Sequence, residues 1–468
     1  MKRNYMYIVL AYGLFLGWLL SFPYNGPVLK HLVLIHQVPI ASFSLVYTVV
    51  PAVFLIIYLL FFQIKEEYAK NIMNWSITAC IVGTVILFTL PTYYWYPVLA
   101  VMGIGSVMYI IGWSYYYTME IPIDEKMRIM ALVIIIGNSI YYVINILHDQ
   151  ISIGFLLAVI IVPLIGAFRA TSNIAVNNKI AVELEHEPLP VKLIFVICSF
   201  LFAVNITDGL TFHAIYPSFD QLFVEYFTFY GIMPYIITLV IIFFFGTKLS
   251  IMFPVFLGTS VLGLAYLSFG LMGKNWYSYF ITETFLQMGW ALLDLVLWTL
   301  FGLIASIYGR PLKICGYAFL ANLLAVFAGG LLAVRILNKL DNYFIISAAF
   351  AIGIIFISFL IVPWLSEAIE KDLRNKLFKT NLQNKPIEEI SPLSIPLPQR
   401  EILTPREREI AELLIQGFTN KQIADLLHIS ENTIKTHTRK IYSKLDVANK
   451  RELLQLSFSS RMSKGRSS

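Results

Sequence analysis

Long apolar runs separated by short polar stretches make up the first 363 residues of the chain. Each run is close to the roughly 20 residues that an α-helix needs to cross a bilayer. The run at 278–307 is too long for one straight, perpendicular span, so it must tilt, break near Gly289 or extend beyond the bilayer. Twelve spans are predicted, at about 5–22, 40–62, 72–90, 97–118, 129–147, 151–168, 193–212, 229–246, 250–270, 278–307, 314–334 and 343–363.

The pattern changes after the last apolar run. Residues 364–380 are mixed in charge and compatible with a helix, so we expect them to continue the last span. Residues 381–399 contain four prolines and predict a partly extended linker of about 25 Å. The expected fold class is all-α: a bundle of 6+6 membrane helices followed by a small four-helix soluble domain. The expected domains are a transmembrane domain at 1–364, a helix extension and linker at 365–400, a soluble domain at 401–460 and a basic tail at 461–468.

Capping chemistry predicts three helix starts in the soluble domain. Thr404 and Glu407 form a capping box, in which a hydroxyl and a carboxylate satisfy the free N–H groups of the first turn. Thr419 and Gln422 repeat the pattern, and Ser430 caps a third helix. Two short helices joined by a tight turn, the second of them basic, indicate a helix-turn-helix.

Charge is distributed unevenly along the chain. Apolar residues make up 58% and charged residues 13%, against roughly 25% charged in soluble domains. Residues 1–364 hold 16 Lys and Arg against 15 Asp and Glu, whereas residues 430–468 hold nine against three. The basic end therefore favours a polyanion as its partner.

Basic residues in the short loops predict the orientation of the spans. Cytoplasmic loops carry an excess of Lys and Arg, and a cytoplasmic N-terminus places twelve such residues inside and four outside. An even number of spans then returns the C-terminus to the cytoplasm of a bacterium, where DNA lies, with the bundle in the inner membrane. The inside set is Lys2, Arg3, Lys65, Lys70, Lys126, Arg128, Arg169, Lys179, Lys192, Lys248, Arg310 and Lys313, and the outside set is Lys30, Lys274, Arg335 and Lys339.

Polar side chains within the spans are candidate ligand-binding groups. A charge at a helix centre costs about 2.5–3.5 kcal/mol on insertion scales, so each one needs a reason. One explanation is a polar cavity, open outward, that binds a small-molecule effector; the other is that these groups satisfy one another and hold helices together. The candidates are Asn138, Asn145, Asn205, Asp208, Glu283, Gln287, Trp290 and Asp294, and the last four share one helical face.

Catalytic and metal-binding signatures are missing from the sequence. Cys80, Cys198 and Cys315 lie far apart without a CxxC pattern, which predicts neither a metal site nor a disulfide framework. There is no nucleotide-binding loop, kinase signature or catalytic constellation. We therefore expect neither an enzyme nor a cofactor.

Three segments of the soluble domain, 403–409, 416–424 and 429–437, resemble the LuxR-type (GerE, NarL/FixJ) helix-turn-helix. The resemblance implies a promoter-binding homodimer, paired through a fourth helix at 446–456, with RNA polymerase as a further candidate partner. His428 and Asp446 stand where the family commonly has Gly, and both residue types tolerate a left-handed backbone.

The third helix of this domain carries the expected DNA-reading face, opposite an apolar face. By the resemblance, Lys435, Thr436 and Arg439 face the bases; Arg can bond both acceptors of guanine, and a Thr methyl can contact thymine. Contacts to phosphates position the domain and make its affinity salt-dependent. The expected phosphate contacts are Asn420, Lys421, Thr433, Lys440 and Lys444, and the expected core is Ile423, Ala424, Leu427, Ile434, Ile441 and Leu445.

The membrane part, two six-helix halves joined by the long inside loop at 169–192, resembles the major facilitator architecture. The family's Gly…Asp-Arg…Gly-Arg-Arg loop is replaced by Lys-Glu-Glu-Tyr-Ala-Lys at 65–70. The sequence therefore predicts a membrane-bound transcription regulator that senses a small molecule or a membrane state. Two alternatives remain: a transporter with a fused regulatory domain, and a scaffold whose helix-turn-helix only dimerises.

Overall fold

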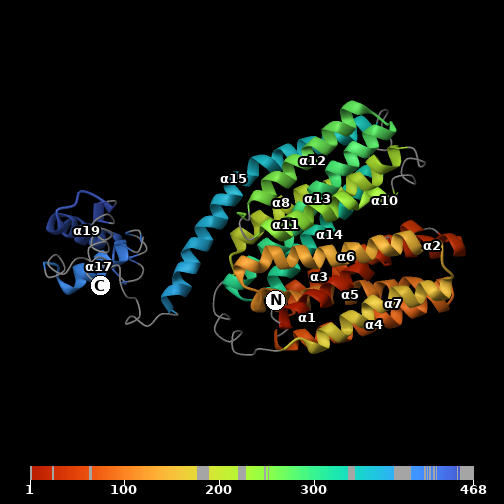
Figure 1. Ribbon diagram of the computed structural model, residues 1–468, viewed down its shortest axis with the longest axis horizontal. Coiled ribbons are helices and arrows are strands. Elements are labelled where there is room, and N and C mark those ends of the chain that lie inside the picture. Colours follow the sequence, from red (N-terminus) through yellow and green to blue (C-terminus); the bar gives the residue numbers. More distant parts are fainter. Residues whose placement is uncertain are drawn as a thin grey trace. The chain divides into compact units, whose positions relative to one another are not determined.

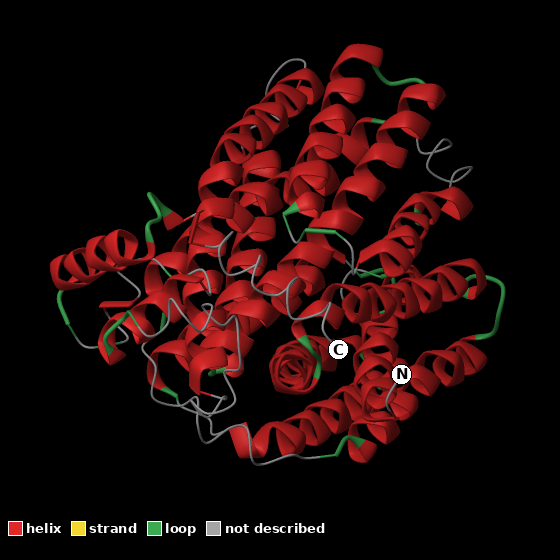
Figure 2. Cartoon of the chain, turned by 60° about the vertical axis from the view of Figure 1, so that its left-hand side comes forward, coloured by secondary structure: helices red, strands yellow, loops and turns green. Residues whose placement is uncertain are grey.

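The computed structural model is helical, and the residues that it describes contain no strand (Figure 2). The chain divides into two compact units, Met1–Arg374 and Asn375–Ser468. The structure describes residues 3–23, 26–38, 40–62, 66–175, 189–219, 228–246, 249–250, 252–335, 343–383, 402–415, 418, 420, 423–424, 427, 429–450 and 452–453.

The first unit is a bundle of apolar helices (Figure 1). Among the described residues, ten helices are long and apolar enough to cross a bilayer, and the apolar stretches Val46–Phe61 and Met233–Phe245 are shorter. Eleven of the twelve predicted spans overlap one α-helix each, whereas the span at 229–246 overlaps two, Thr228–Gly231 and Met233–Phe245. The helices are α1 (Arg3–Ser21), α2 (Pro27–His36), α3 (Ile40–Phe61), α4 (Ala69–Thr89), α5 (Trp95–Glu120), α6 (Lys126–Leu147), α7 (Ile153–Asn173), α8 (Val191–Leu210), α10 (Thr228–Gly231), α11 (Met233–Phe245), α12 (Phe253–Met272), α13 (Trp276–Tyr308), α14 (Pro311–Arg335) and α15 (Tyr343–Gln383).

Helix α2 was not predicted from the sequence. Lys30 and His31 interrupt its apolar pattern, and its 10 residues are too few for a span. It is nevertheless anchored, because Val28, Leu29 and Leu32 are buried against the bundle. Figure 1 shows it at the end of the bundle opposite the start of α1.

The long helix α13 is continuous. It runs for 33 residues, or about 50 Å at 1.5 Å per residue. Asn275 caps its start by accepting a hydrogen bond from the N–H of Ser278 at 2.9 Å, and Gly309, with φ of 69°, follows its end. It does not break at Gly289, where a Cβ atom would lie 2.7 Å from Leu262 Cδ2. This glycine instead allows α12 to approach α13 closely, so tilting or extension beyond the bilayer must accommodate the length.

Two hydrophobic cores form the bundle. One consists mainly of α1–α7 with side chains of α11, and the other mainly of α8 and α12–α15. Trp290 and Trp298 of α13 pack against both cores. The Trp298 ring lies 5.5 Å from the ring of Tyr12 and 6.2 Å from that of Trp113. Helix α13 therefore forms much of the seam between the two halves.

Two lysines assigned to inside loops are bound to helix ends. Lys126 is fully buried, and its Nζ donates to the carbonyls of Tyr117 and Thr118 at 2.9 and 2.8 Å, at the end of α5. Lys70 donates to two carbonyls at the end of α7, both at 2.8 Å. A cation at the C-terminus of a helix offsets the free carbonyls and the negative end of the helix dipole.

Candidate functional site

The C-terminal unit contains α17 (Pro405–Ile415) and α19 (Glu431–Leu445), which pack through one apolar core. The predicted core residues Ile423, Ala424, Ile434, Ile441 and Leu445 are buried, and Leu427 packs at their edge. Because Ile434, Ile441 and Leu445 bury one side of α19, its opposite side must face outward.

Two of the predicted helix starts are confirmed. The N–H of Thr404 donates to Glu407 Oε2 at 3.0 Å, and the N–H of Glu407 donates to Thr404 Oγ1 at 3.3 Å, which is a reciprocal capping box. Ser430 Oγ accepts from the N–H of Thr433 at 3.1 Å at the start of α19. Thr419 and Gln422 of the predicted second cap, and the turn residue His428, lie outside the described residues.

The end of α19 differs from the prediction. Asp446 adopts the left-handed conformation expected of it, with φ of 50°, and ends the helix. The next helix was predicted to begin at Asp446, which is wrong. Asn449 caps it, because its Oδ1 accepts from the N–H of Glu452 at 3.0 Å, while Glu452 Oε2 accepts from the N–H of Ala448 at 2.7 Å. The side chains of Asn449 and Glu452 therefore set this boundary, each by accepting from a backbone N–H group.

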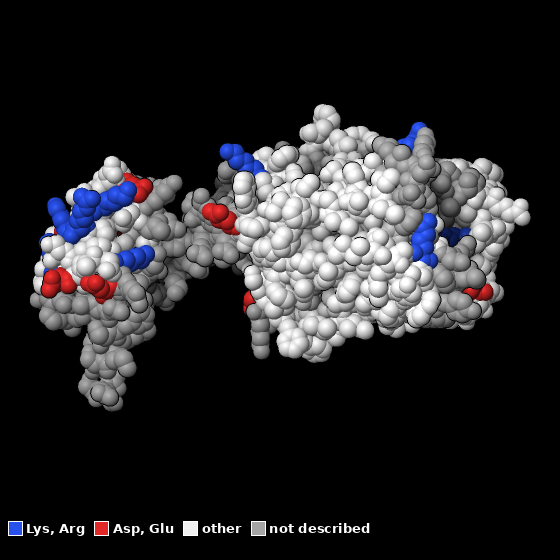
Figure 3. Space-filling model, turned by 90° about the horizontal axis from the view of Figure 1, so that it is seen from above, with Lys and Arg blue, Asp and Glu red and all other residues white. Residues whose placement is uncertain are grey.

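The three candidate base-reading residues are all exposed on α19. Lys435 is paired with Glu431 at 2.8 Å, one helical turn earlier, and Thr436 Oγ1 donates to the carbonyl of Asn432 at 3.0 Å. Arg439 forms no ion pair with the residues that the structure describes. Figure 3 shows basic side chains gathered on the C-terminal unit, whereas the visible face of the membrane unit is largely uncharged.

The candidate phosphate contacts have different surroundings. Thr433 and Lys440 are exposed on α19. Asn420 is half-buried, and its Oδ1 accepts from the hydroxyl of the buried Thr438 at 3.2 Å, so it also braces α19. Lys421 lies outside the described residues. The last candidate, Lys444, is held by an acid.

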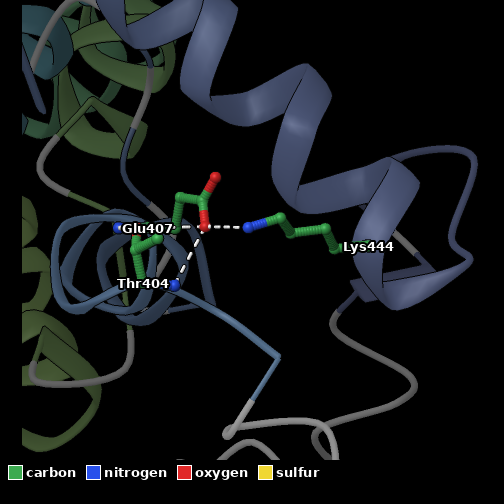
Figure 4. Close-up of polar contacts among 3 residues, drawn as sticks. All are labelled: Thr404, Glu407 and Lys444. Atoms are coloured by element: carbon green, nitrogen blue, oxygen red, sulfur yellow. Dashed lines mark hydrogen bonds and ion pairs between the residues drawn. The ribbon is translucent and has the colours of Figure 1, made fainter.

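An ion pair between Glu407 and Lys444 joins α17 to α19 (Figure 4). Lys444 Nζ lies 2.6 Å from Glu407 Oε2, the oxygen that also accepts from Thr404. The carboxylate is buried, whereas about a third of the Lys444 side chain is exposed. Lys444 and the backbone N–H of Thr404 lower the pKa of Glu407 from 4.5 to about 2. The pair fixes the end of α19 against the start of α17, and no local pattern in the sequence predicts it.

We expect Glu407→Gln to destabilise the C-terminal unit by about 1–3 kcal/mol at pH 7, because Lys444 loses its counter-charge. The lowered pKa of Glu407 adds stability that is fully present above about pH 4.5 and is lost as the pH falls towards 2. Hydrogen exchange of the amides at 405–415 in the full-length protein, corrected for intrinsic rates, measures both effects.

Glu409→Gln is the matched control on the same helix. Glu409 pairs with Arg406 at 2.6 Å, but both side chains are 40% or more exposed. Such pairs contribute about 0–1 kcal/mol, so exchange should change little. Equal protection in the Glu407→Gln protein and the wild type at pH 7 would contradict the bracing role of the Glu407–Lys444 pair.

In the membrane unit, two of the three candidate acids are bonded to tyrosines that the sequence analysis did not include. Tyr216, just after α8, donates to Glu283 Oε2 at 2.8 Å, and Gln287 donates to Glu283 Oε1 at 2.8 Å. Tyr235 of α11 donates to Asp294 Oδ2 at 2.8 Å. The two acids of α13 therefore tie this helix to the segment after α8 and to α11, whose side chains pack in the first core.

The other candidate polar residues are less connected. Asn138 and Asn205 donate to carbonyls one turn earlier in their own helices, at 3.0 and 2.9 Å. Asn145 and Asp208 are half-buried. Trp290 Nε1 is buried without a hydrogen-bond partner among the described atoms. Carbonyls of their own helices thus satisfy Asn138 and Asn205, but Trp290 has no such bond, and both explanations offered from the sequence stay predictions.

The two units resemble different classes of known proteins. Residues 401–457 match the family model of bacterial regulatory proteins, luxR family. The HTH-type transcriptional regulator MalT of Vibrio cholerae is 47% identical over 53 residues, 11% of this chain and 6% of that protein. The monoamine regulon transcriptional regulator of Klebsiella aerogenes is 49% identical over 53 residues, 11% of this chain and 23% of that protein. The chain therefore matches only a small part of the length of these relatives.

Solved transporter structures resemble the membrane unit. The human organic anion transporter MFSD10 aligns with a TM-score of 0.54 at 12% identity, covering 77% of this chain and 97% of that chain. The major facilitator superfamily transporter FucP, in the outward conformation, aligns with a TM-score of 0.54 at 10% identity, covering 77% and 99%. At such low identity the likeness shows the fold alone. The chain thus joins a membrane domain of the major facilitator fold to a C-terminal DNA-binding helix-turn-helix domain of the LuxR family.

Proposed function

We propose that this protein is a membrane-bound one-component transcription regulator, which receives a signal in its membrane domain and binds promoter DNA through its C-terminal domain. The observation that carries the proposal is the union of these two domains in one chain. Transcription regulation is the activity named for the relatives of the C-terminal domain.

On DNA, Lys435, Thr436 and Arg439 read base edges in the major groove. Thr433 and Lys440, with Asn420 and Lys421, contact phosphates. Lys444 contributes mainly by bracing α19, because its ammonium is bound to Glu407. Two such domains pair as a homodimer and read an inverted repeat, since a two-fold protein matches a two-fold site.

In the membrane, the signal changes the arrangement of the two halves around α13. A ligand or bilayer condition can shift this equilibrium only by favouring one arrangement over the other. The candidate residues of this site are the polar side chains of α6, α8 and α13. The basic residues of the predicted inside loops support a bacterial inner-membrane location with both termini in the cytoplasm. There, α15 and the segment after it link the domains.

Releasing the DNA-binding domain from the membrane tests the proposal. A specific protease site is inserted within 384–401 of the full-length protein, and genome-wide binding is mapped before and after cleavage in cells. We expect the released domain to occupy the same promoters, while its occupancy no longer follows the growth conditions that change occupancy by the intact protein.

Two outcomes would contradict this proposal. A cleaved protein that still follows those conditions would place sensing outside the membrane domain. Uptake of a solute into vesicles that depends on Asp294 and is abolished by Asp294→Asn would favour a transporter with a fused regulatory domain.

A further inference from the structure

An apolar cavity of about 220 Å³ lies between α3 and α14. Among the described residues that line it, Thr48 alone has a polar side chain and none is charged. The lining residues are Thr48, Val49, Ala52, Val53 and Ile56 of α3 and Leu323, Leu324 and Phe327 of α14.

The cavity opens towards the bilayer at the seam between the two halves. Val53 and Ile56 on its wall are 50% and 38% exposed, and Leu60 and Phe61 continue the exposed apolar surface along α3. Helix α3 belongs to the first half, whereas α14 packs mainly on α8 of the second half and contributes Leu323 to the first core. In a membrane-embedded protein, lipid hydrocarbon covers such a surface.

The size and chemistry of the cavity favour a hydrocarbon occupant. An apolar cavity of about 150 Å³ already stays dry and accepts a hydrocarbon guest. A polar ligand would lose its hydrogen bonds to water there without gaining partners, at a cost of several kcal/mol. We propose that the cavity binds one acyl chain of a membrane phospholipid and that the protein senses the bilayer through it; the sensing part rests on the function proposed above.

Close packing on both sides of the cavity explains why an acyl chain there would matter. A Cβ atom at Gly329 of α14 would lie 2.1 Å from the carbonyl oxygen of Ile206, so α14 and α8 touch backbone to backbone. On α3, the ring of Pro51 lies against Gly103 of α5, with its Cγ 2.7 Å from where a Cβ would be. The α3 wall is thus tied to α5 and the α14 wall to α8, and an acyl chain between the walls affects the spacing of these two helix pairs.

Proline gives α3 a point at which this wall can bend. Pro51 lies inside the helix and lacks the N–H that would bond to the carbonyl of Tyr47. A helix with such a missing bond bends more readily than a regular one. The wall beside the cavity can therefore follow the presence or absence of an acyl chain.

Photolabelling of the full-length protein in nanodiscs tests the proposal. The nanodiscs contain a phospholipid with a diazirine in its acyl chain, and labelled peptides are identified by mass spectrometry. We expect labelling at 48–56 and 323–327. Ala52→Phe, which fills the cavity, should reduce it by about tenfold or more, because several methylene groups lose their buried contacts. Val162→Phe, at a 65% exposed site on α7, is the matched control and should leave it unchanged.

A second variant guards against misfolding of the Ala52→Phe protein. Phe327→Ala enlarges the cavity and should keep or increase the labelling. Equal labelling of Ala52→Phe and the wild type, or labelling spread evenly over α7 and the cavity, would overturn the site and indicate surface lipid only. Labelling by a free diazirine fatty acid but not by the phospholipid would overturn the proposed source.

Measuring promoter occupancy distinguishes binding of an acyl chain in the cavity from sensing of the bilayer through it. With the site intact, occupancy by the wild type should change with acyl-chain length in the nanodisc, and Ala52→Phe should remove that dependence. Loss of labelling without any change in this dependence would refute sensing through the cavity. A full-length protein that binds no promoter would refute the proposed function, while the labelling result would stand.

Discussion

Replacing Arg439 by alanine in the full-length protein is expected to weaken binding to its promoter DNA by about 5- to 150-fold, the effect of one bidentate contact to a base. Arg439 is exposed on α19, and the burial of Ile434 and Ile441 turns its side outward. Fluorescence anisotropy measures the affinity, using protein in nanodiscs and DNA fragments recovered by genome-wide mapping. Discrimination between bases at one position of the site should also weaken.

Lys440→Ala is the comparison variant, because Lys440 follows Arg439 on α19 and its side chain is also exposed. Because Lys440 is expected to contact a phosphate, its loss should lower the affinity for all DNA sequences alike. The slope of the logarithm of the binding constant against the logarithm of the salt concentration should become shallower by about one. If Arg439→Ala binds the recovered fragments as tightly as the wild type at physiological salt, the result would contradict base reading by Arg439. It would favour the alternative of a scaffold whose helix-turn-helix only dimerises.

The DNA-binding domain was largely predictable because its signals are local. The capping box at Thr404, the cap at Ser430 and the apolar spacing of Ile434 and Ile441 act within one or two helical turns. The bracing of Lys444 was not predictable. Its partner lies 37 residues away in the sequence. From the sequence alone, a lysine on an exposed helix face is predicted to contact phosphate whether or not an acid pairs with it in the fold.

In the membrane domain too, local features were predicted from the sequence and contacts between distant segments were not. Apolar runs predicted its spans because bilayer thickness sets their length. The partners of the acids were missed, since Tyr216 and Tyr235 come close to Glu283 and Asp294 only through the packing of separate helices. Helix α2 was missed because it is too short and too polar to be recognised as a span. The cavity beside α3 likewise depends on which helices become neighbours.

Gly329→Ala is expected to destabilise the membrane domain by about 1–3 kcal/mol or more, the usual range for overpacking. The new methyl group would meet the carbonyl oxygen of Ile206 at 2.1 Å and the Cα of Gly209 at 3.1 Å. Both are backbone atoms, so only separation of α8 and α14 can relieve the clash. The buried free thiols of Cys80 and Cys315 report unfolding. A thiol-reactive dye should label the variant at lower temperature than the wild type.

Gly353→Ala on α15 is the matched control for helix propensity. A Cβ atom at Gly353 meets no atom within 4 Å, and alanine favours a helix over glycine by up to about 1 kcal/mol. This variant should therefore be as stable as the wild type or more stable. The two substitutions are chemically identical, so the difference between them isolates the contact of α8 with α14. If Gly329→Ala unfolds at the same temperature as Gly353→Ala, the backbones of α8 and α14 do not pack as closely as described. The argument that α8 holds the α14 wall of the cavity would then fail as well.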